Sequence, residues 1–400
     1  MIDVKEIRKQ FPVYQKYPDI RFFDTAASAF KHQSVIDAMY DYLAFNGTNV
    51  HRGVYHLAGD ATNRYEAARN KVAAFINCKP ESIIFTKSTT HSLNIAALSL
   101  GSILNPGDEI VISELEHHSN LLPWLAIADK LGLVVKFIPI ENGMITIENF
   151  KKVLTNKTKL VVTHHISNVF GYMTPIKEMV KRAHELGAIV VLDSAQSILH
   201  VKTDVKDLGV DILAFSGHKA YGPNGIGVLY MTSKLMDKLP PVEFGGEMVD
   251  KVYLEGSTWK SGPYKFEAGT PAIAEAIGLA KALEFIESVG IENIHAHEVL
   301  LRNYILDKLK HEKGITIFNK DGESSIITFN IDEVHPHDTA SFLDQYGVAV
   351  RAGHHCNQLT MKYLDQDATV RASIGIYNSI EDCDVLIQAI KETRDFFHNL

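Results

Sequence analysis

Short apolar runs alternate with longer, helix-like segments across the middle of the chain. Segments 90–100 and 176–186 have the length of helices and separate some of these runs. Such alternation is typical of a mostly parallel sheet that helices cover on both faces, with the functional loops at the carboxyl ends of the strands. The pattern therefore predicts an α/β fold with a mostly parallel seven-stranded sheet, its strands at residues 83–85, 109–112, 134–137, 160–162, 189–192, 212–215 and 226–229.

The pattern changes after Gly269-Thr270-Pro271. Long helices are expected at 272–289 and 291–313, a strand at 326–330, and further helices at 339–346 and 380–397. A chain of 400 residues is longer than one hydrophobic core usually serves. We therefore expect a large domain of residues 20–285 and a smaller α+β domain, made of residues 1–19 and 286–400, that closes over the functional site. Because no repeat or Pro/Gly-rich linker intervenes, we expect the two domains to share a substantial interface.

Composition and charge narrow the class of protein. The formal net charge is −8, and no dense block of lysine and arginine occurs, which disfavours nucleic acid and anionic membranes as partners. No apolar run approaches the ~20 residues of a membrane span, and residues 1–6 lack the apolar core of a signal peptide. The three cysteines show neither a disulfide nor a zinc pattern, so we expect a reducing, cytoplasmic location.

Lys219 and Asp193 form the first candidate for chemistry. Asp193 ends one predicted strand, and Lys219 lies on a turn just after the next one. An enzyme that uses pyridoxal 5'-phosphate (PLP) needs a lysine amine to hold the aldehyde as a Schiff base and a carboxylate to keep the pyridine nitrogen protonated. Each residue taken alone has a structural alternative to a PLP role: Lys219 is then a solvated loop lysine, and Asp193 a helix cap.

PLP also needs a site for its phosphate. Thr89 and Thr90 open a helix directly after a strand, and the amides of a helix N-terminus together with hydroxyls bind anions. Ser216 and His218, on the lysine turn, supply further donors. A plain helix cap explains the two threonines equally well. Neither a Walker loop nor a strand-linked Gly-x-Gly-x-x-Gly motif is present, which disfavours nucleotides.

Paired histidines, of which His117 and His118 are one example, suggest either metal binding or contact with a ring. Adjacent residues on a loop point in different directions, and zinc sites usually use wider spacing with further ligands. We therefore expect no metal, and expect His117 to stack on the pyridine ring and exchange protons near neutral pH. Gln196, three residues after Asp193, is close enough along the chain to bond the ring hydroxyl.

Cys356 is the candidate nucleophile. It follows Arg351-Ala352-Gly353-His354-His355, and a nearby cation lowers a thiol pKa below its usual ~8.5. Cys78 and Cys383 lie in helix-like segments without such neighbours, and we expect them to be inert. Arg371, in a strand-like segment, suits a bidentate clamp on a substrate carboxylate. An internal salt bridge is the alternative use of Arg371.

These segments together resemble the class V aminotransferase superfamily of PLP enzymes, and specifically the SufS-type (group II) cysteine desulfurases, which include selenocysteine lyase activity. The resemblance runs along nearly the whole chain, and its Gly-His-His-Cys form separates this group from the housekeeping desulfurases. It implies PLP fold type I. The segments that carry it are 23–28, 49–53, 116–120, 167–171, 193–196, 216–219, 245–248, 266–271 and 351–356.

The resemblance also implies a role for individual residues. It makes Lys219 the Schiff-base lysine that moves the Cα proton, and Cys356 the sulfur acceptor. Asp193 pairs with the pyridinium, Gln196 binds the ring oxygen, and His117 stacks on the ring. The phosphate is held by Thr89, Thr90, Ser216 and His218, and across a homodimer interface by Thr270. The substrate is held or bordered by Asn168, Arg371, Arg351, His51 and Ala27.

The implied reaction converts L-cysteine to L-alanine and leaves a persulfide on Cys356. The persulfide then passes to an acceptor protein of the SufE or SufU kind, for iron–sulfur cluster assembly. Alternatives are selenocysteine lysis, epimerisation or another class V lyase reaction, and a non-catalytic scaffold that binds a sulfur-carrier protein. Two positions depart from the family pattern. After the cysteine, family members usually have a small residue, then one further residue, then proline, where this chain has Asn357-Gln358-Leu359-Thr360. His91 replaces a frequent acidic residue.

Overall fold

A seven-stranded sheet forms the centre of the computed structural model, which describes residues 2–399. The strands are β2 (Ile83–Thr86), β3 (Glu109–Ser113), β4 (Val134–Ile138), β7 (Thr158–His164), β8 (Ile189–Asp193), β9 (Ile212–Ser216) and β10 (Gly227–Met231). Their order is β2-β10-β9-β8-β7-β3-β4. Only β10 runs antiparallel to its neighbours. The predicted mostly parallel sheet of seven strands is therefore confirmed.

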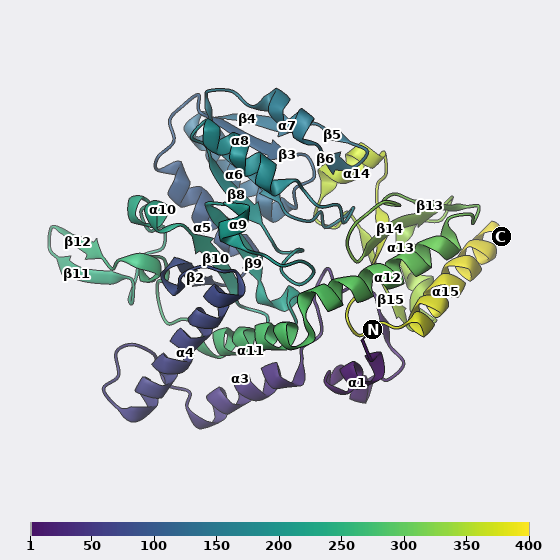
Figure 1. The fold of residues 1–400 in the computed structure, drawn as a ribbon, viewed down its shortest axis with the longest axis horizontal. Coiled ribbons are helices and arrows are strands. Elements are labelled where there is room, and N and C mark those ends of the chain that lie inside the picture. The colour runs from purple at the N-terminus through teal and green to yellow at the C-terminus, as the bar shows by residue number, and fades with distance from the viewer. Residues whose placement is uncertain (1, 400) are drawn as a thin grey trace.

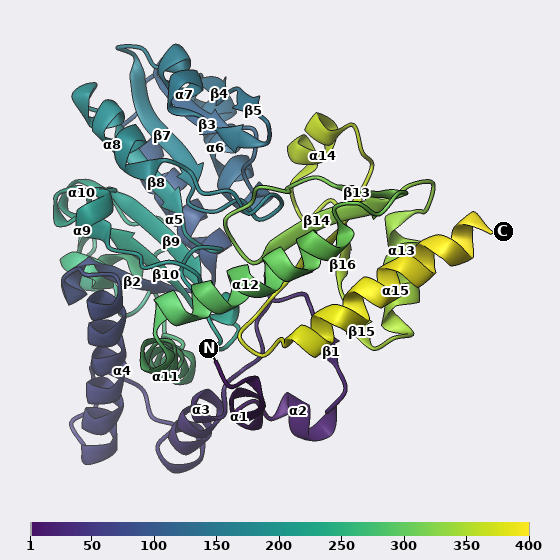
Figure 2. The same cartoon turned by 45° about the vertical axis from the view of Figure 1, so that its right-hand side comes forward.

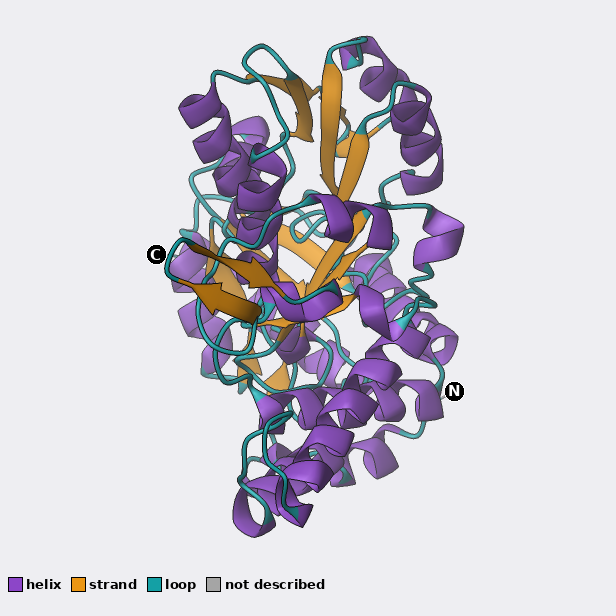
Figure 3. Ribbon diagram, turned by 90° about the vertical axis from the view of Figure 1, so that its left-hand side faces the viewer, coloured by secondary structure: helices purple, strands orange, loops and turns teal. Residues whose placement is uncertain are grey.

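The strands are continuously apolar because both faces of the sheet are buried. Successive residues of a strand point to opposite faces, and along β7 Val161 packs into one core while Leu160 and Val162 pack into another. Figure 3 shows helices on both sides of the strands. One core includes α4 (His56–Phe75), α8 (Ile176–Glu185) and α11 (Ile273–Val289), and the other includes α5 (Thr89–Gly101), α6 (His118–Leu131) and α10 (Ser233–Lys238). No helix within residues 2–399 is long and apolar enough to cross a membrane.

A second, antiparallel sheet has its own core. Its order is β13-β14-β17-β16, with β13 (Ile315–Ile317), β14 (Ile326–Ile331), β16 (Arg351–Gly353) and β17 (Thr369–Ser373). The helices α12 (Ile291–Leu309) and α15 (Ile380–His398) lie side by side against it (Figure 2). The helix predicted at 339–346 is α13 (Pro336–Asp344), which begins and ends earlier than predicted. The helix predicted at 291–313 is α12, which ends at Leu309. The predicted boundary at 285/286 lies inside α11, and the division into domains stays a prediction.

Shorter elements complete the chain. The hairpin β11 (Val249–Tyr253) and β12 (Gly256–Trp259) projects away from the body in Figure 1, and the sequence pattern did not predict it. The other elements are α1 (Val4–Lys9), α2 (Val13–Lys16), β1 (Arg21–Phe22), α3 (Gln33–Phe45), β5 (Ile140–Glu141), β6 (Met144–Ile145), α7 (Ile147–Val153), α9 (Val205–Leu208), β15 (Val348–Ala349) and α14 (Gln358–Leu364).

Buried polar contacts join the two halves of the molecule. The Asn319 side chain donates to the Phe170 carbonyl at 2.8 Å, and a fully buried pair joins His200 to Glu298 at 2.5 Å. Arg371 on β17 donates to the Asn168 carbonyl beyond β7 at 2.9 Å. These contacts hold the small sheet over the carboxyl ends of the large one, where the candidate site lies.

Candidate active site

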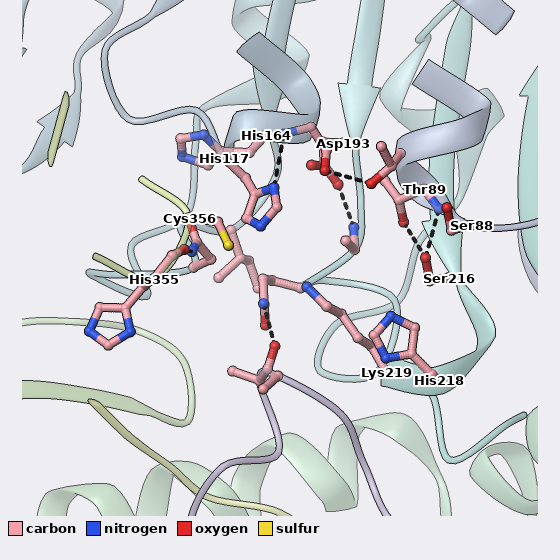
Figure 4. Close-up of a pocket in the computed structure, with 18 of the residues that line it drawn as sticks. Ser88, Thr89, His117, His164, Asp193, Ser216, His218, Lys219, His355 and Cys356 are labelled. Carbon is pink, nitrogen blue, oxygen red and sulfur yellow. Dashed lines mark hydrogen bonds between the residues drawn. The ribbon is translucent and has the colours of Figure 1, made fainter. Parts of the chain in front are cut away.

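A cavity of about 230 Å³ lies at the carboxyl ends of β7, β8 and β9, beneath the small sheet. All the residues predicted for the site line it except His51 and Thr270. Figure 4 shows several of them converging from separate elements. The predicted residues that line the cavity are Ala27, Thr89, Thr90, His117, Asn168, Asp193, Gln196, Ser216, His218, Lys219, Arg351, Cys356 and Arg371.

Asp193 and Lys219 supply opposite charges to the cavity without forming a salt bridge. Asp193 ends β8 and is 6% exposed, and its Oδ1 accepts a hydrogen bond from the Ala195 amide at 2.8 Å. Burial raises the pKa of the Asp193 carboxyl, while Lys219 opposes this effect. Burial lowers the pKa of Lys219 to about 8, against the attraction of Asp193. The site thus combines a buried carboxylate that needs a cationic partner with an amine that is readily neutral.

The N-terminus of α5 and the lysine turn together form a hydroxyl-lined corner. Ser88, not a threonine, caps α5, and its Oγ accepts from the His91 amide at 3.2 Å. The Ser216 hydroxyl lies 2.7 Å from both the amide and Oγ1 of Thr89. A Cβ at Gly227 would lie 2.5 Å from the Ser88 backbone, so only glycine lets β10 approach this cap. Helix amides and hydroxyls at one corner are suited to a phosphate dianion.

The ring of His117 is neutral and oriented. His117 caps α6, and its Nδ1 accepts from the Ser119 amide at 3.1 Å. Burial, with a contribution from Lys219, lowers the pKa of His117 to about 3. Because Nδ1 is the acceptor in the neutral ring, the proton resides on Nε2. Likewise, burial lowers the pKa of His218 to about 4, so that this residue offers a neutral ring to the cavity.

Arg371 lines the cavity, and its guanidinium bonds to groups of the chain itself. Its Nη1 donates to the Asn168 carbonyl at 2.9 Å, and its Nη2 to Asp24 Oδ1 at 3.3 Å. The buried Nε has no hydrogen-bond partner within residues 2–399, and an unpaired buried N–H is costly. Burial lowers the pKa of Arg371 to about 10, whereas Asp24 raises it. The alternative internal salt bridge, to Asp24, is thus present, and the carboxylate clamp stays a prediction.

Cys356 is the exposed cysteine of the three. It lies in the short loop between β16 and α14, and both His355 (φ 52°) and Cys356 (φ 54°) have left-handed backbones. Burial raises the pKa of Cys78 to about 12 and also raises the pKa of Cys383. Cys78 lies in a turn after α4 rather than within the predicted helix, because α4 ends at Phe75.

The positive charge expected around Cys356 comes from arginine rather than from His355. Burial lowers the pKa of His355 to about 2, and its Nε2 lies 2.9 Å from Thr369 Oγ1. Arg351 and Arg371 line the same cavity as the thiol, and Cys356 acts to raise the pKa of Arg371. Arg371 is therefore a cation near the sulfur.

His51 and Thr270 do not line the cavity within one chain, and the expectation that His51 borders the site stays a prediction. The His51 ring is held by Glu66, with Nε2 to Oε1 at 3.0 Å, and packs edge-on against Tyr65 and Tyr264. His51 instead lines a separate small depression together with Gly269. Thr270 is exposed at the surface, so any contact of its hydroxyl with a phosphate involves a second chain.

Two further residues at the site were missed from the sequence. His164 lines the cavity, and its Nδ1 lies 2.8 Å from Oε1 of the fully buried Glu116. The pair places Glu116 behind the wall that carries His117. Asp24 holds Arg371, as described above. His164 ends β7 opposite Asp193 in register, and this position at a strand end was the signal available in the sequence.

The donor set fits PLP. Asp193 is a buried carboxylate without a salt-bridge partner among residues 2–399, as a protonated pyridine requires. Lys219 has the lowered pKa of an amine that condenses with an aldehyde. Gln196 lines the same wall and donates to the Ala26 carbonyl at 2.9 Å, which fixes the segment that carries Ala27.

Known proteins resemble this chain over almost its full length. A probable cysteine desulfurase of Halalkalibacterium halodurans is 47% identical, with 99% of each chain covered, and one of Staphylococcus epidermidis is 45% identical over 99% of this chain and 98% of its own. A cysteine desulfurase from Thermococcus onnurineus NA1 superposes with a TM-score of 0.95 at 39% identity, covering 99% of this chain and 98% of its own.

The cysteine desulfurase CsdA from Escherichia coli superposes with a TM-score of 0.93 at 36% identity, covering 99% of both chains. These likenesses confirm the predicted PLP fold type I. Residues 21–386 match the family described as aminotransferase class V. The chain belongs to the class V aminotransferase family of PLP enzymes.

Proposed function

We propose that this enzyme is a SufS-type (group II) cysteine desulfurase, which converts L-cysteine to L-alanine and holds the released sulfur as a persulfide on Cys356. The carrying observation is that the exposed thiol of Cys356 lines the same cavity as Lys219 and Asp193. A PLP enzyme that only moves amino groups has no use for a free thiol at this position. The curated relatives described as probable cysteine desulfurases support the proposal.

PLP, when bound, supplies a protonated ring that accepts electrons from the substrate Cα. Asp193 would hold the proton on the ring nitrogen, and Gln196 would bind the ring oxygen. Thr89, Thr90, Ser216 and His218 hold the phosphate at the corner beside α5. Since the pKa of Lys219 is about 8, its amine is substantially neutral near pH 8. Lys219 is therefore both the attachment point and the base that removes the Cα proton.

The substrate carboxylate binds at the wall formed by Arg371, Arg351 and Asn168. Cys356 Sγ then attacks the substrate sulfur as a thiolate. A sulfur–sulfur bond forms while the carbon–sulfur bond breaks, and the electron pair of the broken bond stays with the carbon fragment. The fragment takes up a proton and leaves as alanine, and His117 is the carrier that passes this proton from its Nε2 and regains one from solvent.

The geometry of the Cys356 loop supports transfer to an acceptor protein. Only residues 354–357 separate β16 from α14, so the loop is short and cannot carry the persulfide far. An acceptor of the SufE or SufU kind must come to the cavity, and iron–sulfur cluster assembly is the process that the sulfur supplies.

The exposed Thr270 reaches the phosphate of a neighbouring subunit in a homodimer.

The test is the product analysis of the holo-protein. Purified protein should be yellow, should lose its colour with borohydride, and should release equal amounts of alanine and sulfide from L-cysteine in the presence of a reducing thiol. A parallel assay with selenocysteine separates the alternative lyase activity. Yellow protein that racemises cysteine or releases sulfide only with loss of ammonia would contradict the desulfurase assignment, and colourless protein without activity would favour the scaffold alternative.

A further inference from the structure

The residue after Cys356 ties the thiol loop to the opposite half of the molecule. Asn357 is 1% exposed. Its Nδ2 donates to the Leu115 carbonyl at 2.7 Å and lies 3.4 Å from Asn168 Oδ1. Its Oδ1 accepts from the Thr360 amide at 3.3 Å and so caps α14. One side chain therefore joins the loop, the helix behind it and the large sheet.

Three further hydrogen bonds cross the same seam. The His118 amide donates to the Cys356 carbonyl at 2.8 Å, and the Gln358 amide donates to His118 Nε2 at 3.2 Å. Asn168 Nδ2 donates to the His355 carbonyl at 2.7 Å. On the loop side these three bonds use backbone atoms, so they do not depend on the side chains of the loop. Asn357 is different, because its bonds to Leu115 and Thr360 are made by the side-chain amide. Substitution of Asn357 by alanine therefore removes them.

The loop needs such support because of its backbone. Two consecutive residues with a Cβ, His355 and Cys356, have positive φ values of 52° and 54°. Such conformations are sparsely populated in a free chain and persist only where the surroundings impose them. The His355 ring bonds back to Thr369 of the small sheet, so it does not fix the loop against the large sheet. Asn357 does so directly.

The partner segment of Asn357 is also the one that carries His117. Leu115 precedes His117 and accepts a bond from Asn357. His118 follows His117, donates to the Cys356 carbonyl and accepts from the Gln358 amide. The bonds therefore set the position of the Cys356 sulfur relative to the ring-stacking residue and to Asn168. A displacement of about 1 Å is enough to slow a positioned reaction strongly.

We propose that Asn357 is a positioning residue, whose side-chain amide holds the Cys356 loop on the segment 115–118 so that the thiol meets the substrate sulfur. This inference rests on the proposed desulfurase function. It also gives a role to the departure at 357–360, where the family's small residue and proline are replaced. In this chain a hydrogen-bonded amide holds the loop in place of that pattern.

The test compares two variants with a matched control in the holo-protein. Asn357→Asp keeps the shape of the side chain and its bond to Thr360, but it has no donor for the Leu115 carbonyl. Asn357→Ala removes all of these bonds. Asn330→Ala is the control, since Asn330 is 8% exposed, donates to the Gln366 side chain at 2.9 Å and to the Ala368 carbonyl at 3.1 Å, and accepts from the Val370 amide at 3.3 Å. None of these partners belongs to residues 354–364.

Two readouts separate positioning from general destabilisation. Hydrogen exchange of the amides in 354–364 should be at least tenfold faster in both Asn357 variants and unchanged in Asn330→Ala. Persulfide formation on Cys356 in a single turnover should slow by roughly ten- to hundredfold. The cysteine-induced absorbance change of the cofactor should be retained, because it does not depend on the thiol.

Wild-type exchange in the loop of Asn357→Asp, or an equal loss of persulfide formation in Asn330→Ala, would overturn the proposal. If Asn357→Ala does not fold, Asn357→Asp alone decides the matter. If wild-type protein itself forms no persulfide, the proposed function fails instead, and the exchange measurement still reports on whether Asn357 holds the loop.

Discussion

The amine of Lys219 should titrate well below an ordinary lysine in the cofactor-free protein. Burial in the cavity lowers its pKa to about 8, and Asp193 limits the shift by attraction. At that pH about half of the Lys219 amines are neutral, whereas a lysine with the ordinary pKa of about 10.4 is only ~0.4% neutral. Reaction with an amine-directed reagent should therefore be about a hundredfold enriched at Lys219.

The assay is competitive reductive methylation of cofactor-free protein between pH 6 and 11, with N-acetyl-lysine amide as the internal standard and peptide mass as the readout. The modification of Lys219 should reach its midpoint near pH 8. Asp193→Asn removes the attraction that favours the charged amine, so its midpoint should be lower. Arg371→Met removes a repelling charge, so its midpoint should be higher.

Stability should follow the same shift. Between pH 8 and 10.5 the unfolded chain binds a proton at Lys219 that the folded chain has released, so the free energy of unfolding rises with pH in this window. The burial cost, about 3 kcal/mol, is fully present below pH 8 and is relieved as the pH rises to about 10.5. Relative to Lys219→Met, wild-type protein should gain stability across this window.

In the methylation assay, a midpoint for Lys219 equal to that of the free lysine standard would refute the reasoning.

Three further predictions concern the cofactor, the assembly and the core. Lys219→Ala should still bind PLP weakly through the phosphate contacts but lose alanine production by several orders of magnitude, and substantial turnover would contradict its role. The holo-protein should sediment as a dimer at micromolar concentration, and Thr270→Ala should weaken PLP retention; a fully active monomer would exclude the shared phosphate site. Arg69 is 1% exposed and bonds to Glu267 at 2.7 Å, so Arg69→Met should lower the free energy of unfolding by about 3–5 kcal/mol in urea denaturation, and an unchanged midpoint would argue against that buried pair.

The strands of the large sheet were predictable because their burial is local information. In β7, β8 and β9 both faces are covered, so each strand is a continuous apolar run regardless of what it pairs with. The hairpin β11–β12 gave no such signal, because it is exposed along most of its length and has no alternating apolar face. The order of the strands depends on pairings distant in sequence and was not predictable from the runs themselves.

The candidate site also has residues that local sequence predicted and contacts that it did not. Asp193, Lys219 and Cys356 follow strand ends or a distinctive loop, and the structure brings all three to one cavity. The contact of Asn357 with Leu115 joins residues 242 positions apart, and no local pattern encodes it. The sequence marked Asn357 only as a departure from a family pattern, and the three-dimensional contact gave that departure a physical meaning.

The most direct test of the central claim is the intact mass of the protein after a short pulse of L-cysteine, compared between wild type and Cys356→Ser. Because the thiol takes no part in binding the cofactor, the variant should keep the PLP absorbance and its response to cysteine. Wild-type protein should gain the mass of one sulfur atom, localised to Cys356 by peptide analysis, and Cys356→Ser should gain none and lose nearly all turnover of cysteine. Equal sulfur addition to both proteins would place the label on Cys78, Cys383 or adventitious sulfide, and would contradict the assignment of Cys356 as the sulfur acceptor.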